Sequence, residues 1–372
     1  MQLQVLAKSK SSWLSGKGAE VEVVLSSRIR LARNLSGKPF PNRASRTVQK
    51  EVFNQVEEAV KKVASSSVVP NFRDGMVVLH LNDLDVVDRQ FLMERHLISY
   101  EHAQSNLEGG LVIGEGEKVS IMINEEDHLR LQSLESGLAL NSAWENLNSL
   151  DDELAKYLPY AFSSQWGFLT ACPTNTGTGL RVSCLMHLPG LVYTEEINRV
   201  LQNLSKIGIV ARGFYGEGTK VMGDFFQISN STTLGQTETE IIDNLNRVIK
   251  QIIEYEKKER TKLVEEGEYT RAKTEDAIYR TYGTLLYARA ITYEEALNFL
   301  SKVRLGIYLG LNIPLDLGLL NELLLLAQPA HLQELAGKEL SPTERDILRA
   351  KFMREKFDKT VKNTVKKNKN FS

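Results

Sequence analysis

The sequence has few cysteines: only Cys172 and Cys184 occur among its 372 residues. Two cysteines make a poor disulfide framework, and no His/Cys cluster has the spacing of a zinc site. A reducing cytosol therefore fits this chain best, and we expect a cytoplasmic protein. The net charge of −1 gives no overall reason to bind nucleic acid. Any phosphate chemistry must come from local clusters of arginine.

Long apolar runs are also missing. The N-terminal stretch MQLQVLAKSKSSWLSG has no apolar core of signal-peptide length. The leucine-rich run Leu315–Leu326 carries Asp316 and Glu322 and is too short to cross a bilayer. We expect a buried helix there and no association with a membrane.

The familiar nucleotide-binding motifs are absent as well. The sequence has no G-x-x-x-x-G-K-[ST], which argues against a P-loop, and no H-R-D or D-F-G, which argues against a eukaryotic-type protein kinase. If the chain handles a nucleotide, arginines rather than a glycine cradle must hold it.

Two arginines occupy one face of a predicted strand within Val21–Leu35. Because strand side chains alternate, Arg28 and Arg30 point to one side, and Ile29 and Leu31 point to the other. Neighbouring arginines repel each other unless an anion lies between them. The pattern is typical of a solvated edge strand or of a phosphate clamp, for which the guanidinium fork is well suited.

Three consecutive acids, Glu125 to Asp127, follow the predicted strand Val119–Ile123. Such acids are costly to hold together unless they face a cation or solvent. One interpretation is a solvated turn. The other is that one carboxylate faces a positively charged substrate while Arg130 faces another group.

Cys172 begins a turn of proline, asparagine and glycines that leads into a predicted strand, Leu180–His187. Pro173 fixes one dihedral angle, and Gly177 and Gly179 permit tight or left-handed backbone, so the cysteine should be held rigidly at a strand edge. A lone cysteine on a turn is usually inert. The other motifs are what make it a candidate.

The rest of the chain separates into two textures. Up to about Lys262, strands, hairpins and amphipathic helices alternate, which indicates an α+β domain with a largely antiparallel sheet flanked by helices. From about Glu265 the strand signals vanish. We predict an α+β domain over residues 1–262 and an all-α domain over 263–372. Its basic tail, 351–372, has eight Lys/Arg against two acids.

Four motifs together resemble the phosphagen (guanidino) kinase family. They are Ser27–Arg30, Asn124–Arg130, Cys172–Arg181, and Arg212–Glu217 followed by Gln227–Asn230. Their order and spacing fit across roughly residues 20–255. The resemblance implies transfer of a phosphoryl group from a Mg-nucleotide, Mg²⁺ with ATP, to a guanidinium group.

Departures from that family's pattern indicate which of its members this chain resembles. The first arginine motif begins almost at the N-terminus, where small-molecule guanidino kinases carry a helical domain, and Gly218 replaces a histidine. This chain adds a C-terminal helical domain. The combination is similar to bacterial protein arginine kinases, which phosphorylate arginine side chains of proteins. That similarity implies a phosphoarginine mark read by a Clp-type protease, an adaptor-like activator, a heat-shock repressor among the substrates, and a homodimer.

The resemblance also assigns roles to individual residues. It implies that the nucleotide phosphates are bound by Arg28, Arg30, Arg130, Arg181 and Arg212. It implies that Glu126 and Glu217 clamp the guanidinium, with Cys172 beside them. No residue is assigned as a metal ligand. The segment Glu344–Ala350 resembles a phosphoarginine-sensing site with Arg345, Asp346 and Arg349, although charge pairing on a helix surface explains it equally well.

A guanidinium is a poor nucleophile because its lone pair is delocalised and its pKa exceeds about 12. Carboxylates must fix its plane and accept a proton, and Glu126 is the predicted base. A Cys172 thiolate would add negative charge nearby without forming a covalent intermediate. Two alternatives stay open: a kinase of free arginine or another small guanidine, and a non-catalytic adaptor that binds phosphoarginine.

Overall fold

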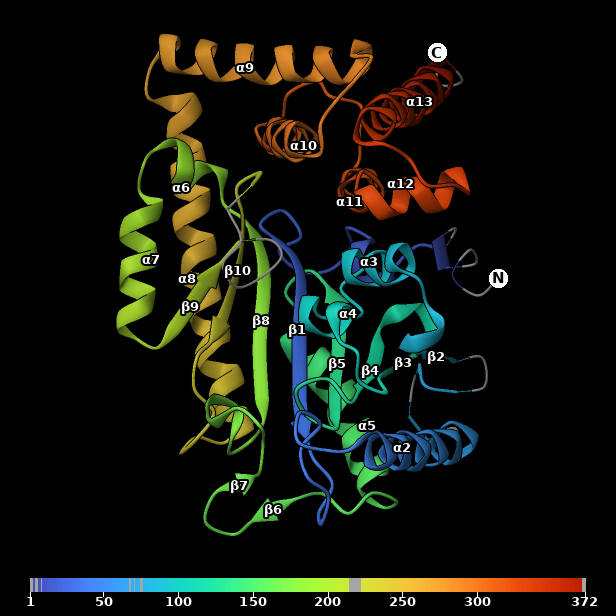
Figure 1. Ribbon diagram of the computed structural model, residues 1–372. Coiled ribbons are helices and arrows are strands. Elements are labelled where there is room, and N and C mark those ends of the chain that lie inside the picture. The colour runs from blue at the N-terminus through green and yellow to red at the C-terminus, as the bar shows by residue number, and fades with distance from the viewer. Residues whose placement is uncertain are drawn as a thin grey trace.

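The computed structural model describes residues 3, 6–7, 9–66, 68–69, 71–73, 76–213 and 222–369, with side chains up to Asp358. An eight-stranded sheet in the order β2-β3-β4-β5-β1-β8-β10-β9 runs through its centre (Figure 1). All its described pairings are antiparallel. The strands are β1 Val24–Arg33, β2 Val77–His80, β3 Gly110–Ile113, β4 Val119–Ile123, β5 Leu129–Ser136, β8 Leu180–His187, β9 Ile209–Arg212 and β10 Phe225–Asn230.

One face of the sheet packs against three long helices, α2 (Arg46–Ser66), α5 (Leu140–Ala155) and α8 (Glu238–Glu265). The apolar side chains of the central strands, such as Ile29 and Leu31, are fully buried on this side. They meet the apolar stripes of the helices in one core. Burial of this apolar face is the main force that holds the layer together.

The opposite face is covered by other elements at its β2–β4 side. Phe91 and Leu92 of α3 (Val86–Glu94) and Ala103 of α4 (Tyr100–Gln104) share a core with Leu111 and Met122 of the sheet. The sequence predicts a helix over Asp88–Ser99; the structure has a helix there, but the predicted C-terminal end was wrong. The helix stops at Glu94 because His96 adopts a left-handed backbone with φ of 60°.

The C-terminal part is helical, as predicted, and lies at one end of the sheet (Figure 1). Its helices are α9 Glu268–Tyr287, α10 Tyr293–Tyr308, α11 Leu317–Leu326, α12 Pro329–Ala336 and α13 Pro342–Lys369. Leu25, Leu185 and Phe225 of the sheet belong to the same apolar cluster as Leu297 and Leu324 of these helices. The fold class predicted from the sequence, an antiparallel sheet with helices plus an all-α part, is confirmed.

Capping-box patterns in the sequence, Thr237-x-x-Glu240 and Ser341-x-x-Glu344, predict two helix starts, and the structure confirms both. Thr237 N donates to Glu240 Oε2 at 2.8 Å while Glu240 N donates to Thr237 Oγ1 at 3.3 Å, a capping box that opens α8. Ser341 and Glu344 make the same reciprocal bonds before α13. Helix α8 continues to Glu265, past the predicted boundary at residue 262, and the division of the chain there stays a prediction.

The predicted leucine-rich helix is α11, and most of its leucines are buried. No helix in the described part of the chain is long and apolar enough to cross a membrane.

Candidate active site

Strand register places the five predicted arginines on one face of the sheet. Arg30 in β1 lies opposite Arg181 in β8, and Ala32 lies opposite Arg130 in β5. Residues directly opposite each other point to the same face, as do alternate residues along one strand. Arg28, opposite Ser183, therefore joins this face. Arg212 in β9 pairs with Gln227 in β10. Because β10 in turn pairs with β8, the register places Arg212 on the same face of the sheet as the other four arginines.

Burial and this concentration of positive charge lower the pKa values of two of these arginines. Burial, together with the charges of Arg130 and Arg181, lowers the pKa of Arg28 to about 10. Burial and the neighbouring Arg28 lower the pKa of Arg30 as well. Among the described residues, Arg30 Nε has no hydrogen-bond acceptor. A polyanion such as a triphosphate would satisfy these groups, which favours the phosphate clamp over a solvated edge strand.

A further arginine of β1, Arg33, has a structural task. Arg33 Nη2 pairs with the buried Asp151 of α5 at 2.7 Å, and its Nη1 donates to the Thr178 carbonyl at 2.9 Å. Its guanidinium stacks 3.5 Å above the Phe168 ring. Arg33 thus fastens the segment that carries Cys172 to the end of the central strand.

The three consecutive acids are divided between different tasks. Asp127 Oδ1 accepts hydrogen bonds from Asn34 Nδ2 at 2.6 Å and from Ala171 N at 2.7 Å, so it joins the acidic turn to the cysteine segment. Glu125 Oε1 accepts from Ser99 Oγ at 2.6 Å. Burial opposes the charge of Glu125, but Arg130 and the Ser99 bond outweigh it and hold its pKa below the ordinary value. Glu125 therefore faces the arginine cluster as a carboxylate.

Glu126 is the most exposed of the three acids, with 46% of its side chain accessible. It lies 3.8 Å from Arg130 Nη1, and Asn175 Nδ2 donates to its Oε2 at 3.5 Å. Burial and the adjacent Asp127 raise the pKa of Glu126 above its usual value. An accessible carboxylate with a raised pKa suits proton abstraction from an incoming group.

Cys172 directly precedes the 3-10 turn η4 (Pro173–Asn175), whose Asn175 contacts Glu126. The cysteine is half-buried, and its Sγ lies 3.0 Å from Thr174 Oγ1. The predicted tight backbone is confirmed at Gly179, where φ is 66° and a Cβ would lie 2.6 Å from the Ala32 carbonyl oxygen. Cys184, by contrast, is buried in the core, and burial raises its pKa to about 12. Only Cys172 is placed to meet a substrate.

Glu217 and Gly218 lie outside the described residues, and the predicted roles there stay predictions. Arg212 is the last residue of β9. On the neighbouring strands, Arg181 Nη2 donates to Ser229 Oγ at 3.3 Å.

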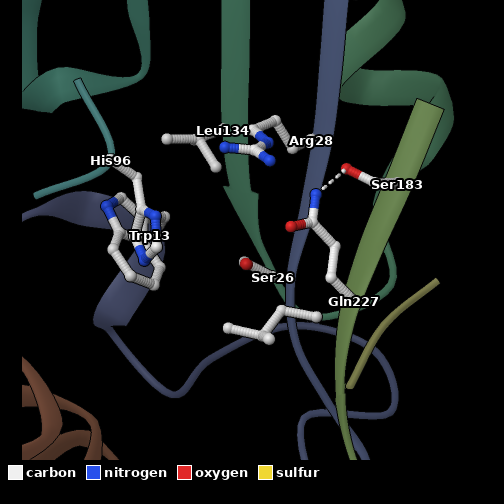
Figure 2. A pocket seen from close by; sticks show the side chains of 8 residues that line it. Trp13, Ser26, Arg28, His96, Leu134, Ser183 and Gln227 are labelled. Atoms are coloured by element: carbon white, nitrogen blue, oxygen red, sulfur yellow. Dashed lines mark hydrogen bonds between the residues drawn. The ribbon is translucent and has the colours of Figure 1, made fainter. Parts of the chain in front are cut away.

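His96 is a site residue that the sequence reasoning missed. It lines one cavity together with Arg28, Gln227 and Leu134 (Figure 2). Burial, with Arg28 and Arg30 nearby, lowers the pKa of His96 to about 3, so the ring is neutral at physiological pH. The Gln132 amide donates to the His96 carbonyl at 2.6 Å. No helical or strand periodicity in the sequence identifies His96 as a site residue, because a bend after α3 brings it close to the arginines.

His128 has a structural part despite its place in the acidic motif. Leu35 N donates to its Nδ1 at 3.0 Å, so the proton lies on Nε2, which is 3.0 Å from the Pro39 carbonyl oxygen. Both ring nitrogens are occupied, and burial lowers the pKa of the ring. His128 therefore fixes the loop after β1 and does not transfer protons.

The predicted phosphoarginine-sensing residues lie on α13, in the helical part and apart from the sheet arginines (Figure 1). Arg349 is buried and donates to the carbonyls of Ala327 at 2.6 Å and Ile291 at 2.7 Å, and to Asp346 Oδ1 at 2.6 Å. These bonds join α13 to the segments that precede α10 and α12. Arg345 is half-exposed and donates to the Leu340 carbonyl at 2.9 Å.

Within the described ranges, no group of three or more His, Cys, Asp or Glu side chains could hold a metal ion. The candidate site thus consists of the five arginines on one face of the sheet, named here the arginine wall. One accessible carboxylate, Glu126, and the half-buried Cys172 lie beside it.

Two known domain families match the chain. Residues 55–259 match the ATP:guanido phosphotransferase, C-terminal catalytic domain, and residues 271–368 match the protein-arginine kinase McsB C-terminal domain. A protein-arginine kinase of Halothermothrix orenii is 48% identical over 357 residues, which cover 95% of this chain and 98% of that protein. The Bacillus subtilis protein-arginine kinase is 43% identical, with 93% of each chain covered.

Solved structures show the same fold. The duplicated taurocyamine kinase from Schistosoma mansoni with bound transition state analog components matches with a TM-score of 0.57 and 25% identity, over 65% of this chain and 34% of that one. Lombricine kinase matches with a TM-score of 0.55 and 24% identity, over 65% of this chain and 68% of that one.

Proposed function

This chain belongs to the ATP:guanido phosphotransferase family, and we propose that it transfers the γ-phosphoryl group of ATP to arginine side chains of proteins. The family resemblance predicted from four sequence motifs is confirmed. The observation that supports a protein as the substrate is the match of residues 271–368 to the protein-arginine kinase C-terminal domain. Relatives with the name protein-arginine kinase align over nearly the whole chain.

The arginine wall has the charge and geometry to bind the triphosphate. Arg28, Arg30, Arg130 and Arg181 lie on adjacent strands and present guanidinium groups to one face. Arg212, on the same side, is assigned with them. Phosphoryl transfer depends mainly on holding the reactants in line and on balancing charge as the bond to the leaving group breaks. Mg²⁺ would be bound through the nucleotide phosphates and would balance part of their charge.

Glu126 is assigned as the base. As a guanidinium nitrogen of the substrate attacks the γ-phosphorus, its N–H proton passes to the Glu126 carboxylate, the bond between the γ-phosphorus and the bridging oxygen breaks, and ADP leaves. The raised pKa of Glu126 lies closer to physiological pH than that of an ordinary glutamate, so its carboxylate is a stronger base. Glu217 is assigned as the second carboxylate of the clamp, on the strength of the motif alone.

Cys172 is assigned an electrostatic part. As a thiolate near the guanidinium it would localise the electrons on the attacking nitrogen. Its half-buried position and the Asn175 connection to Glu126 support this assignment.

The biological setting extends the proposal. We assign the activity to the cytoplasm, with a phosphoarginine mark read by a Clp-type protease, an adaptor-like activator, a heat-shock repressor among the substrates, and a homodimeric enzyme. The similarity to bacterial protein-arginine kinases supports these assignments. Arg345 and Asp346 are assigned as the sensing residues, whereas the three hydrogen bonds of the buried Arg349 favour a structural part.

The decisive experiment incubates the protein with Mg-ATP and an arginine-rich protein, in parallel with free L-arginine. Products are read by mass spectrometry without acid, because the N–P bond is acid-labile. Phosphate on protein arginines and none on the free amino acid is expected. Phosphoarginine formed only from the free amino acid would instead indicate a small-guanidine kinase. No transfer with either substrate, even with a co-expressed activator, would indicate the non-catalytic adaptor.

A further inference from the structure

The cavity beside Arg28 is partly built by the N-terminal segment. Trp13, in the 3-10 turn η1 (Ser12–Leu14), lines this cavity with His96 and Arg28 (Figure 2). The Trp13 side chain is only 1% exposed. Its indole N–H finds no acceptor in the described part of the chain. A tryptophan thus forms a wall of the cavity without a polar contact that explains its place there.

Trp13 contacts the residues that face the nucleotide arginines. Its ring lies edge-on to His96, with 5.4 Å between the ring centroids. It also packs against Leu134 of β5, which is the register partner of Arg28 in β1. A change in the position of Trp13 would therefore reach Arg28 from two sides, through the His96 ring and through Leu134.

The C-terminal helices hold Trp13 from behind. Leu325 of α11 belongs to the same apolar cluster as Trp13 and Leu14. Asn321 Nδ2 donates to the Leu14 carbonyl at 3.4 Å, and its Oδ1 accepts from Arg304 Nη1 at 2.6 Å. Arg304 Nη2 in turn donates to the Val21 carbonyl at 2.7 Å. Two helices of the C-terminal part therefore grip residues 14–21.

The backbones come into direct contact at two glycines. A Cβ on Gly16, where φ is 65°, would lie 2.8 Å from the Gly318 nitrogen of α11. A Cβ on Gly318 would lie 2.9 Å from the Ser15 carbonyl oxygen. Larger residues at either place would push the segment away from the helix, so this packing has a narrow tolerance.

On the basis of the nucleotide site assigned above, we propose that Trp13 is a positioning residue for the nucleotide. It is held by α11 and holds His96 and Leu134 beside Arg28, so the C-terminal helices set the affinity for ATP at the sheet.

The first test uses the fluorescence of Trp13. The protein has three tryptophans, Trp13, Trp144 and Trp166. The double variant Trp144→Phe/Trp166→Phe leaves Trp13 as the only one, and its emission is followed during titrations with ADP and with inorganic tripolyphosphate. ADP and tripolyphosphate are both expected to change the emission with saturation, because each places phosphate groups against Arg28. Calorimetry confirms occupancy in each titration. Unchanged emission with ADP bound would overturn the proposal.

The second test separates positioning from general damage. Trp13→Phe and Leu325→Ala are expected to raise the KM for ATP about 5- to 30-fold, the factor to which a free-energy difference of about 1–2 kcal/mol corresponds. The kcat at saturating ATP and the KM for the protein substrate are expected to change little. Trp166→Phe, a change at an exposed tryptophan, serves as the matched control. A normal KM for ATP in folded Trp13→Phe would overturn the proposal, even if Leu325→Ala fails to fold.

ADP binding is measured without turnover, so the two proposals fail separately. ADP binding that depends on Trp13, without transfer to arginine, would contradict the proposed function alone. Normal transfer with nucleotide affinity independent of Trp13 would contradict this inference alone.

Discussion

Arg30 and Arg181 lie directly opposite each other in the antiparallel pairing of β1 and β8. Like charges at such a position destabilise a sheet. Arg28 and Arg130 add to the repulsion: burial first, and then the neighbouring arginine charges, lower the pKa values of Arg28 and Arg30. The centre of the sheet therefore carries a repulsion that a bound anion would offset.

A polyanion should stabilise the fold for this reason. We expect tripolyphosphate to raise the melting temperature by several degrees at concentrations well above its dissociation constant. Arg181→Gln should melt at a higher temperature than the unchanged protein without anion, and should shift less when the anion is added. Differential scanning fluorimetry at constant ionic strength measures both. A lower melting temperature for anion-free Arg181→Gln would show that repulsion is not the dominant effect.

Replacement of the proposed base should separate chemistry from binding. Glu126→Gln is expected to lower kcat by about 10²- to 10⁴-fold, the usual contribution of a general base, because an amide does not accept the proton. The dissociation constant for ADP should stay within a few-fold. Steady-state assays give kcat, and calorimetry gives the dissociation constant for ADP. Glu145→Gln, on the exposed face of α5, is the control. Near-normal turnover of Glu126→Gln would remove Glu126 from this role.

The pH dependence should report the same carboxyl group. Glu126 must be ionised to accept a proton, and burial raises its pKa above the model-compound value of 4.5. Activity is therefore lost as the pH falls through this raised pKa, and kcat/KM should show an acidic limb above pH 4.5. The limb should be absent from the residual activity of Glu126→Gln. An acidic limb that persists there belongs to another group.

The two cysteines should differ sharply in reactivity. Cys172 is half-buried beside the acidic turn, whereas Cys184 is buried with its pKa raised to about 12. Iodoacetamide should modify Cys172 in the folded protein and Cys184 only after denaturation. Peptide mass spectrometry locates the label. Cys172→Ser should keep part of the activity, since no covalent intermediate is proposed, and a complete loss in a folded variant would contradict that.

Arg349 and Arg345 should behave differently when each is replaced by alanine. Arg349→Ala leaves two buried backbone carbonyls without a donor and should destabilise the protein by about 2–4 kcal/mol. Urea unfolding monitored by circular dichroism measures this. Arg345→Ala should change stability little but weaken stimulation by a phosphoarginine-bearing protein. An unchanged response would leave Arg345 without a sensing part.

Local chemistry in the sequence predicts much of this molecule. Alternation places Arg28 and Arg30 on one face, and the Thr237 and Ser341 caps mark where two helices start. Strand register, which is long-range, then decides which other arginines join them. His96 escaped prediction because its place depends on a left-handed turn after α3 that no neighbouring residue announces. Trp13 escaped because its partners, Leu134 and Leu325, are more than a hundred residues away along the chain.

The grip of α11 on the N-terminal segment has a consequence for protein synthesis. A growing chain has all five arginines of the site once residue 212 is made, yet Leu325 and Gly318 follow more than a hundred residues later. Domains generally fold as they leave the ribosome, starting from the N-terminus. Until α11 emerges, Trp13 lacks its support, and we therefore expect the nascent sheet to bind nucleotide weakly. Interrupted translation would thus release fragments that carry the arginines of the candidate site but do little phosphorylation.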